Sequence, residues 1–177
     1  MKKLFCFITI ITITTLRLNS QYNSLIEQIK NIKTMPHCLD QISQLDEDKV
    51  FWELVKLKKE IIPDLLNLID DTTKLKANVR WFSGKWTVGD AAYRVIQEII
   101  YDIPTFELMN TNFNDGDCGY CAYWQHLRLD YSNRLKFKLN LTNWYQTNKS
   151  NLVWNKSDDI SECMYTNPNK GFYVIKK

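Results

Sequence analysis

Residues 87–101 constrain the fold more than any other part of the sequence. Their apolar side chains recur every three or four residues, at Val88, Ala91, Ala92, Val95, Ile96, Ile99 and Ile100. This spacing puts them on one wide face of an α-helix. Thr87 is placed to cap the first turn, with Asp90 three residues later as the short-armed acid of a capping box, and Pro104 follows as a stop signal. We expect a central helix whose apolar face is covered by its neighbours.

Apolar spacing, prolines and turn residues also predict the elements on both sides of this helix. The expected elements are a helix over 22–33, a further turn over 36–44, helices over 46–61 and 62–69, a loop or short strand over 74–85, and a short strand over 171–176. The predicted fold class is therefore mainly α, a small helical domain with a short C-terminal strand.

Residues 122–146 carry two competing patterns. Helical spacing is seen at Tyr123, Trp124, Leu127 and Tyr131, and strand-like alternation at Leu135, Phe137, Leu139 and Leu141. Because no turn signal interrupts the stretch, we expect one long helix, bent near Ser132 and Asn133. The chain after residue 148 reads as a loop up to the C-terminal strand.

The order of elements over residues 46–101 resembles a HEAT-type helical repeat. A helix and a tight turn precede a second helix that begins Ile62-Pro63-Asp64-Leu65-Leu66, and a third begins Val88-Gly89-Asp90-Ala91-Ala92. The resemblance implies HEAT-like helix pairs over roughly one and a half units, whereas solenoids need about three. The Asp70-Asp71-Thr72-Thr73 stretch, the Val88-Gly89-Asp90 helix start and the tryptophan-rich C-terminal third also resemble a family of uncharacterised secreted bacterial proteins. That second resemblance implies no function.

The N-terminal residues have the pattern of a signal peptide. Met1-Lys2-Lys3 precedes an apolar run from Leu4 to Leu16, and a polar segment ends at Ser20, a small residue suited to cleavage. The run is short for a membrane span, which needs about 20 apolar residues, although an uncut signal anchor is the alternative. We expect a signal peptide over 1–20 and a single helical domain over 21–177, periplasmic or secreted.

The excess of basic over acidic residues in the chain comes from this predicted leader. The whole sequence has 23 basic and 20 acidic residues, and removal of residues 1–20 leaves 20 of each. A formally neutral mature chain gives no argument for a nucleic-acid partner. No mature segment is long and apolar enough to span a membrane.

Four cysteines remain after export, at Cys38, Cys118, Cys121 and Cys163. Cys118-Gly-Tyr-Cys121 can form a disulfide, exchange one, or supply half of a zinc site. A second pair at zinc spacing is absent, and Asp115 and Asp117 oppose a thiolate. A structural disulfide is the favoured interpretation for an exported chain. Of three possible pairings, Cys118–Cys121 with Cys38–Cys163 is our first expectation.

The best candidate for a binding surface precedes the central helix. Two tryptophans, a phenylalanine and two cations gather there, at Arg80, Trp81, Phe82, Lys85 and Trp86. Aromatic residues and arginine are frequent interface anchors, and helix starts attract anions through free N–H groups. Alternatively, the tryptophans pack over the helical core and Asp90 satisfies the helix start.

Other candidate sites are weaker. The oxygen-rich loop Asn112, Asn114, Asp115 and Asp117 departs from calcium-loop spacing, and His37 and His126 lack the neighbours of a catalytic triad. There is no Walker loop, no Rossmann glycine pattern and no His-Glu-x-x-His. We therefore predict no cofactor, no metal and no catalytic set.

The sequence favours a non-enzymatic, exported helical module that binds a protein or peptide partner. The alternatives are an extracytoplasmic thiol–disulfide oxidoreductase that uses Cys118 and Cys121, and a secreted small-molecule or glycan binder that uses the tryptophans.

Overall fold

The computed structural model of the 177-residue chain describes residues 24–36, 49–79, 83–111, 119–156 and 171–176. The described part is mainly helical, with two small antiparallel two-stranded sheets. Residues 24–28 are helical and lead into η1. The elements are η1 (Ile29–Asn31), α2 (Lys49–Lys56), η2 (Lys58–Ile61), α3 (Ile62–Leu68), β1 (Lys74–Asn78), β2 (Lys85–Thr87), α4 (Val88–Ile99), α5 (Thr105–Leu108), α6 (Gly119–Leu129), α7 (Tyr131–Asn148), η3 (Lys149–Asn151), β3 (Leu152–Lys156) and β4 (Gly171–Ile175).

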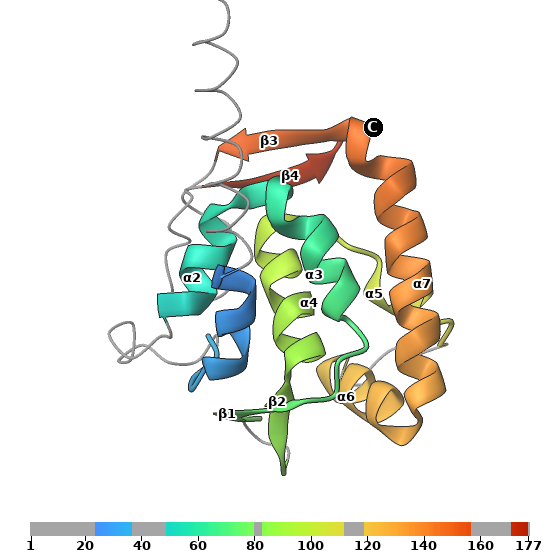
Figure 1. Cartoon of the computed structure of the whole chain (residues 1–177). Helices are drawn as coiled ribbons and strands as arrows, with labels where there is room; N and C mark the ends of the chain where they lie inside the picture. The colour runs from blue at the N-terminus through green and yellow to red at the C-terminus, as the bar shows by residue number, and fades with distance from the viewer. Residues whose placement is uncertain (1–23, 37–48, 80–82, 112–118, 157–170, 177) are drawn as a thin grey trace, which may run out of the picture.

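Helix α4 lies at the centre of the molecule, with α2 on one side and α3 and then α7 on the other, and one small sheet lies at each of its ends (Figure 1). Its start is the predicted capping box. The backbone of Thr87 is extended, its side chain accepts from the Asp90 N–H, and the Asp90 carboxylate accepts from the Thr87 N–H. The helix ends at Ile99, where the next residue turns extended and bridges to Tyr173 of β4.

The predicted apolar face of α4 is buried. Each of its seven stripe residues is at most 1% exposed. Gly89, Asp90 and Tyr93 are buried as well, so elements cover α4 on more than its apolar side. Gly89 permits the closest approach, because a Cβ there would lie 2.2 Å from the carbonyl oxygen of Ile69, just after α3. The interior of the molecule is therefore organised around α4, as the sequence predicts.

The expected helix over 46–61 is wrong beyond Lys56. Residue 57 is a turn, and Lys58 has a φ of 56°, a left-handed conformation that ends an α-helix. The Lys58 ammonium lies 4.1 Å from the ring centroid of Trp154, so a distant aromatic side chain contacts this break. The next helix, α3, begins with Pro63 in its first turn, as predicted.

The expected single helix over 122–146 is also wrong. The chain breaks at Asp130, whose backbone is extended and whose side chain accepts from the Ser132 N–H as the N-cap of α7. The Asn133 side-chain amide donates to the carbonyl oxygen of His126 in the last turn of α6. These local bonds satisfy both helix ends, which is why two helices are stable where one was expected.

The C-terminal strand β4 confirms the prediction, whereas the expected loop after residue 148 is wrong over residues 149–156; its remainder, residues 157–170, lies outside the described residues. Residues 149–151 form η3, and β3 follows as the antiparallel partner of β4, with Trp154 opposite Tyr173. The segment 74–85, expected to be a loop or short strand, contains β1 and ends where β2 begins. The HEAT-like pairing of helices stays a prediction.

Candidate functional site

Two of the five residues of the predicted binding segment are described, and both hold the β1–β2 sheet. The Lys85 ammonium donates to the carbonyl oxygen of Lys76 at 2.7 Å and to Asn78 Oδ1 at 2.6 Å. The Trp86 indole donates to the carbonyl oxygen of Asn78 at 3.1 Å and is 6% exposed. Trp86 thus packs over the core, the alternative raised by the sequence. Arg80, Trp81 and Phe82 lie outside the described residues, and their binding role stays a prediction.

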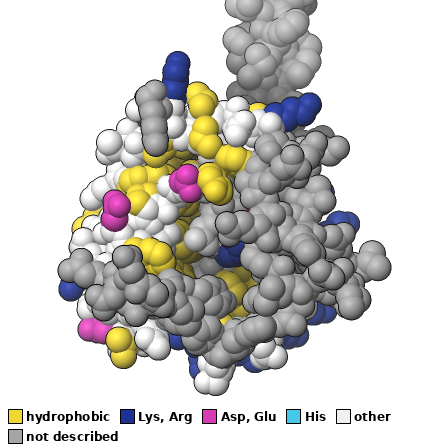
Figure 2. Space-filling model, turned by 180° about the vertical axis from the view of Figure 1, so that it is seen from behind, with side chains coloured by type: hydrophobic (Ala, Val, Ile, Leu, Met, Phe, Trp, Pro, Cys, Tyr) yellow, Lys and Arg dark blue, Asp and Glu magenta, His cyan; other side chains and the backbone are white. Residues whose placement is uncertain are grey.

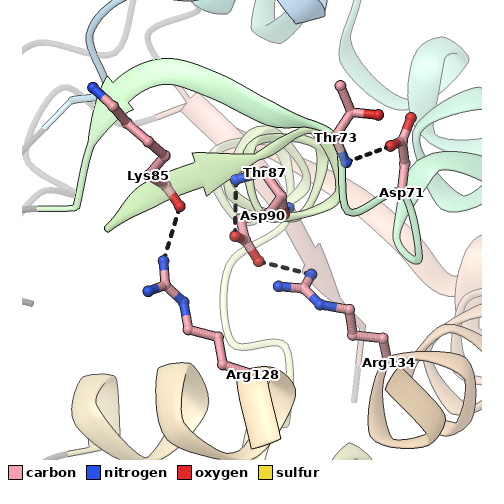
Figure 3. Close-up of polar contacts among 7 residues, drawn as sticks. All are labelled: Asp71, Thr73, Lys85, Thr87, Asp90, Arg128 and Arg134. Atoms are coloured by element: carbon pink, nitrogen blue, oxygen red, sulfur yellow. Dashed lines mark hydrogen bonds and ion pairs between the residues drawn. The ribbon is translucent and has the colours of Figure 1, made fainter. Parts of the chain in front are cut away.

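Arg128 of α6 holds the end of this sheet. Its guanidinium donates to the carbonyl oxygens of Ser83 at 3.2 Å and Lys85 at 2.9 Å. It also lies 4.7 Å from the ring centroid of Trp124. Figure 3 shows Arg128 reaching from its helix toward Lys85. One side chain therefore fixes β2 against α6.

The N-terminus of α4 is satisfied by the protein itself. The Val88 N–H donates to the carbonyl oxygen of Thr73 and the Gly89 N–H to that of Asp71, both at 2.9 Å. The Asp90 N–H donates to Thr87 Oγ1 at 3.2 Å. These are the groups that would attract an anion at a helix start. The structure thus agrees with the alternative in which the helix start is closed.

Asp90 also forms a buried ion pair with α7. One carboxylate oxygen accepts from the Thr87 N–H at 3.0 Å, and the other lies 2.9 Å from Arg134 Nη1. The two side chains of the pair are 0% and 4% exposed. Figure 3 shows Arg134 reaching from α7 to Asp90. A single carboxylate therefore caps α4 and joins it to a helix about 40 residues later in the chain.

A pocket of about 240 Å³ lies along α4. Helix α4 supplies one wall, and α5, α6 and β2 supply the others. The lining is mostly apolar. The lining residues are Trp86, Asp90, Tyr93, Arg94, Gln97, Thr105, Phe106, Tyr123 and Trp124. Four of these lie on α4 between positions 90 and 97, so at 1.5 Å per residue that wall is about 10 Å long.

The aromatic walls of the pocket hold one another in place. Trp86 and Trp124 meet edge to face, with ring centroids 4.7 Å apart and planes at 87°. Tyr93 stacks on Tyr123 at 5.4 Å and meets Phe137 of α7 edge to face at 4.9 Å. Such contacts restrict the rings to one arrangement. The pocket is therefore formed before any ligand arrives.

A phenol and a guanidinium give the pocket its polar character. The hydroxyl groups of Tyr93 and Thr105 are 2.5 Å apart. Burial raises the pKa of Tyr93 well above its ordinary value, so the phenol stays neutral. Arg94 pairs with Glu98, one turn further along α4, and only Arg94 of that pair lines the pocket. Among the described lining residues the ionic side chains are Arg94 and Asp90, and each of them has an ion-pair partner.

Hydrophobic side chains form patches on the face opposite to that of Figure 1, with acidic side chains beside some of them (Figure 2). Phe106, which lines the pocket, is 40% exposed, and Tyr101, which does not, is 48% exposed. Phe106 therefore contributes to the pocket from the surface, whereas Trp86 and Trp124 form its buried base.

The sequence analysis missed most of this site. Tyr93, Arg94 and Gln97 lie off the apolar stripe of α4, and Phe106 belongs to a one-turn helix that was not expected. The available signal was Tyr93, an aromatic residue on the polar side of a helix. The adjacent rings of Tyr123 and Trp124 were assigned only to a helical pattern.

The described residues contain no group of three His, Cys, Asp or Glu side chains that could hold a metal ion, and no helix among them is long and apolar enough to cross a membrane. His126 is partly exposed, and burial and the charge of Lys136 lower its pKa. His37 lies outside the described residues, as do the signal peptide and the Asn112–Asp117 loop.

The cysteine predictions stay predictions. Cys121 lies in the first turn of α6, close to the start of the helix at Gly119. Cys38, Cys118 and Cys163 lie outside the described residues, so neither the expected pairing nor a redox role is decided here.

Comparison with protein-family models, curated proteins and solved structures gives no match. The function is therefore argued from the geometry and chemistry of the pocket.

Proposed function

We propose that this chain is a non-enzymatic binding module that receives one aromatic side chain of a protein or peptide partner in the pocket along α4. The observation that carries the proposal is the pocket itself, a half-open space of about 240 Å³ that is lined by five aromatic side chains. Aromatic and arginine side chains dominate the energetics of protein interfaces. In this proposal the module is exported, and its helices over residues 46–101 pair as in HEAT repeats.

The size of the pocket supports a single side chain as its occupant. Pockets for drug-sized ligands usually measure about 300–1,000 Å³, and a cavity of about 150 Å³ is enough for benzene. A volume of about 240 Å³ lies between these values. It suits a group of one or two rings, such as the side chain of phenylalanine, tyrosine or tryptophan.

The arrangement of the rings argues against a glycan. Sugars stack on the exposed flat faces of aromatic side chains, whereas Trp86 and Trp124 are 6% and 1% exposed and face each other edge to face. The thiol–disulfide alternative depends on cysteines of which the structure describes only the backbone of Cys121. The binding module is therefore the function that the described geometry supports best.

We expect N-acetyltryptophanamide, a neutral mimic of a tryptophan residue within a peptide, to bind with a dissociation constant on the order of 0.1–1 mM. Phe106→Ala removes one wall of the pocket and should weaken this binding about three- to ten-fold. Tyr101→Ala is the matched control, because Tyr101 is an equally exposed aromatic residue outside the pocket. Isothermal titration calorimetry gives the dissociation constant for the parent protein and for each of the two variants.

Both variants should keep the melting temperature of the parent protein within a few degrees, because both rings are partly in solvent. Absence of saturable binding to the parent protein would reject the proposed function. Equal loss of affinity in the two variants would place the binding site elsewhere.

A further inference from the structure

We propose that the aromatic side chain bound in the pocket carries a hydrogen-bond donor on its ring, as tryptophan and tyrosine do, and that Gln97 accepts from this donor. The inference rests on the proposed function and adds to it a choice among aromatic side chains, in which phenylalanine is disfavoured. Its basis is a series of hydrogen bonds along one wall of the pocket, whose direction is set by a backbone carbonyl group.

This series of hydrogen bonds ends at the backbone of Ile103. The hydroxyl group of Thr105 donates to the carbonyl oxygen of Ile103 at 3.2 Å, and a carbonyl oxygen can only accept. The single hydroxyl proton of Thr105 is thereby used. The phenol of Tyr93 therefore supplies the proton of the 2.5 Å bond between the two hydroxyl groups. Both hydroxyl groups belong to residues that line the pocket, and neither has a proton left for a ligand.

Gln97 stands at the other end of the series. Its side chain forms a hydrogen bond with Tyr93, one turn earlier in α4. Because the proton of the phenol is directed to Thr105, the amide N–H of Gln97 is the donor in this bond. The carbonyl oxygen of the same amide is left as an acceptor, with no further hydrogen bond to the described part of the chain. Gln97 lines the pocket and is partly exposed, so this amide is within reach of a ligand.

The charged side chains of the lining do not compete for this role. The side chain of Asp90 is 0% exposed and pairs with Arg134, so its carboxylate is closed to a ligand. Arg94 pairs with Glu98 and, as a guanidinium, has no acceptor to offer. Gln97 is therefore the acceptor that a ring donor would meet on the α4 wall.

A hydrocarbon ring and a ring with a donor should thus bind differently. A phenylalanine side chain would cover the carbonyl oxygen of Gln97 and offer nothing in place of its hydrogen bond to solvent. An indole N–H or a phenol O–H would supply the missing bond. A net hydrogen bond of this kind changes an affinity by about three- to ten-fold.

The test compares two ligands of nearly the same shape, N-acetyltryptophanamide and N-acetyl-3-(benzothiophen-3-yl)alaninamide. The second carries sulfur in place of the indole N–H, and the indole N–H can only donate. We expect the parent protein to bind the tryptophan ligand about three- to ten-fold more tightly. Without a hydrogen bond the order would be reversed or lost, because the benzothiophene ring is the more apolar of the two. Calorimetric titration gives both affinities.

Gln97→Met keeps the length of the side chain and removes the acceptor. It should weaken binding of the tryptophan ligand about three- to ten-fold and change the affinity for the benzothiophene ligand by less than about two-fold. A merely structural role of Gln97 would change both affinities equally. Gln125→Met is the matched control, since Gln125 is an exposed glutamine on α6 that does not line the pocket. This control should keep both affinities of the parent protein.

The outcomes separate the inference from the proposed function. If the parent protein binds the benzothiophene ligand at least as tightly as the tryptophan ligand, the inference fails and the proposed function stands. This comparison needs no variant, so it decides the inference even if Gln97→Met does not fold. If Gln97→Met folds and keeps the preference of the parent protein, Gln97 is not the acceptor and the inference is overturned. If the parent protein binds neither ligand, the proposed function fails as well.

Discussion

Replacing Asp90 by alanine is expected to lower the free energy of unfolding by about 3–5 kcal/mol. The carboxylate caps α4 through the Thr87 N–H and is the ion-pair partner of Arg134, whose side chain is 4% exposed. Without Asp90, the guanidinium stays buried with its charge uncompensated. Chemical denaturation measured by circular dichroism gives the change, and the melting temperature should fall by about 2–4 °C for each kcal/mol.

Two further variants separate the charge of Asp90 from its role as a cap. Asp90→Asn keeps an oxygen that accepts from the Thr87 N–H but removes the charge. It should therefore lower the free energy of unfolding by about 1 kcal/mol less than Asp90→Ala does. Adding Arg134→Met to Asp90→Asn should restore most of the lost stability, because no buried charge is then left without a partner. A cost below about 1 kcal/mol for Asp90→Asn alone would contradict the importance of the ion pair.

Gly89→Ala is expected to destabilise the protein by about 3 kcal/mol. Glycine-to-alanine changes within helices usually stabilise, because they restrict the unfolded chain. Here the added Cβ would lie 2.2 Å from the carbonyl oxygen and 2.8 Å from the carbonyl carbon of Ile69. Both are backbone atoms, so the start of α4 must move away from α3. The bond from the Gly89 N–H to the carbonyl oxygen of Asp71 would then lengthen as well.

Urea denaturation of Gly89→Ala measures this effect, with Asn67→Ala on the exposed face of α3 as the control for helix propensity. The control should be neutral or slightly stabilising. A Gly89→Ala protein as stable as the parent would show that α4 and α3 do not approach as closely as described.

The central helix could be predicted from the sequence because its determinants are local. The cap formed by Thr87 and Asp90 spans four residues, and the apolar stripe repeats with the period of the helix. Pro63 likewise marked the start of α3. Strand β4 was predicted from a short run of aromatic and β-branched residues that ends the chain.

Features that depend on distant residues could not be predicted. Strand β3 pairs with β4, which lies beyond residues 157–170 in the chain. Lys58 has a left-handed backbone conformation, and its ammonium group lies over the ring of Trp154. Asp130 is a residue type that often caps helices, but the apolar pattern continues through it, so the sequence analysis predicted no break there. Arg134 reads as a surface residue until α7 is packed against Asp90.

Most residues of the pocket could not be predicted from the sequence for the same reason. Its walls come from four elements between residues 86 and 124, and the sequence pointed to only one of its residues, Trp86, as a candidate for binding. Trp86 was a candidate because it lies close in sequence to other aromatic residues. The structure gives Trp86 a different context, at the base of a pocket beside Trp124.

The most direct test of the account is to observe the tryptophan indole N–H groups by ¹H–¹⁵N NMR during a titration with N-acetyltryptophanamide, with signals assigned by single Trp→Phe variants. The account predicts that the signals of Trp86 and Trp124 shift together and saturate with one dissociation constant, while those of Trp52 and Trp154, outside the pocket, stay in place. Among the six tryptophans of the chain, shifts of equal size at Trp52, Trp86, Trp124 and Trp154, or shifts that grow linearly without saturation, would contradict it.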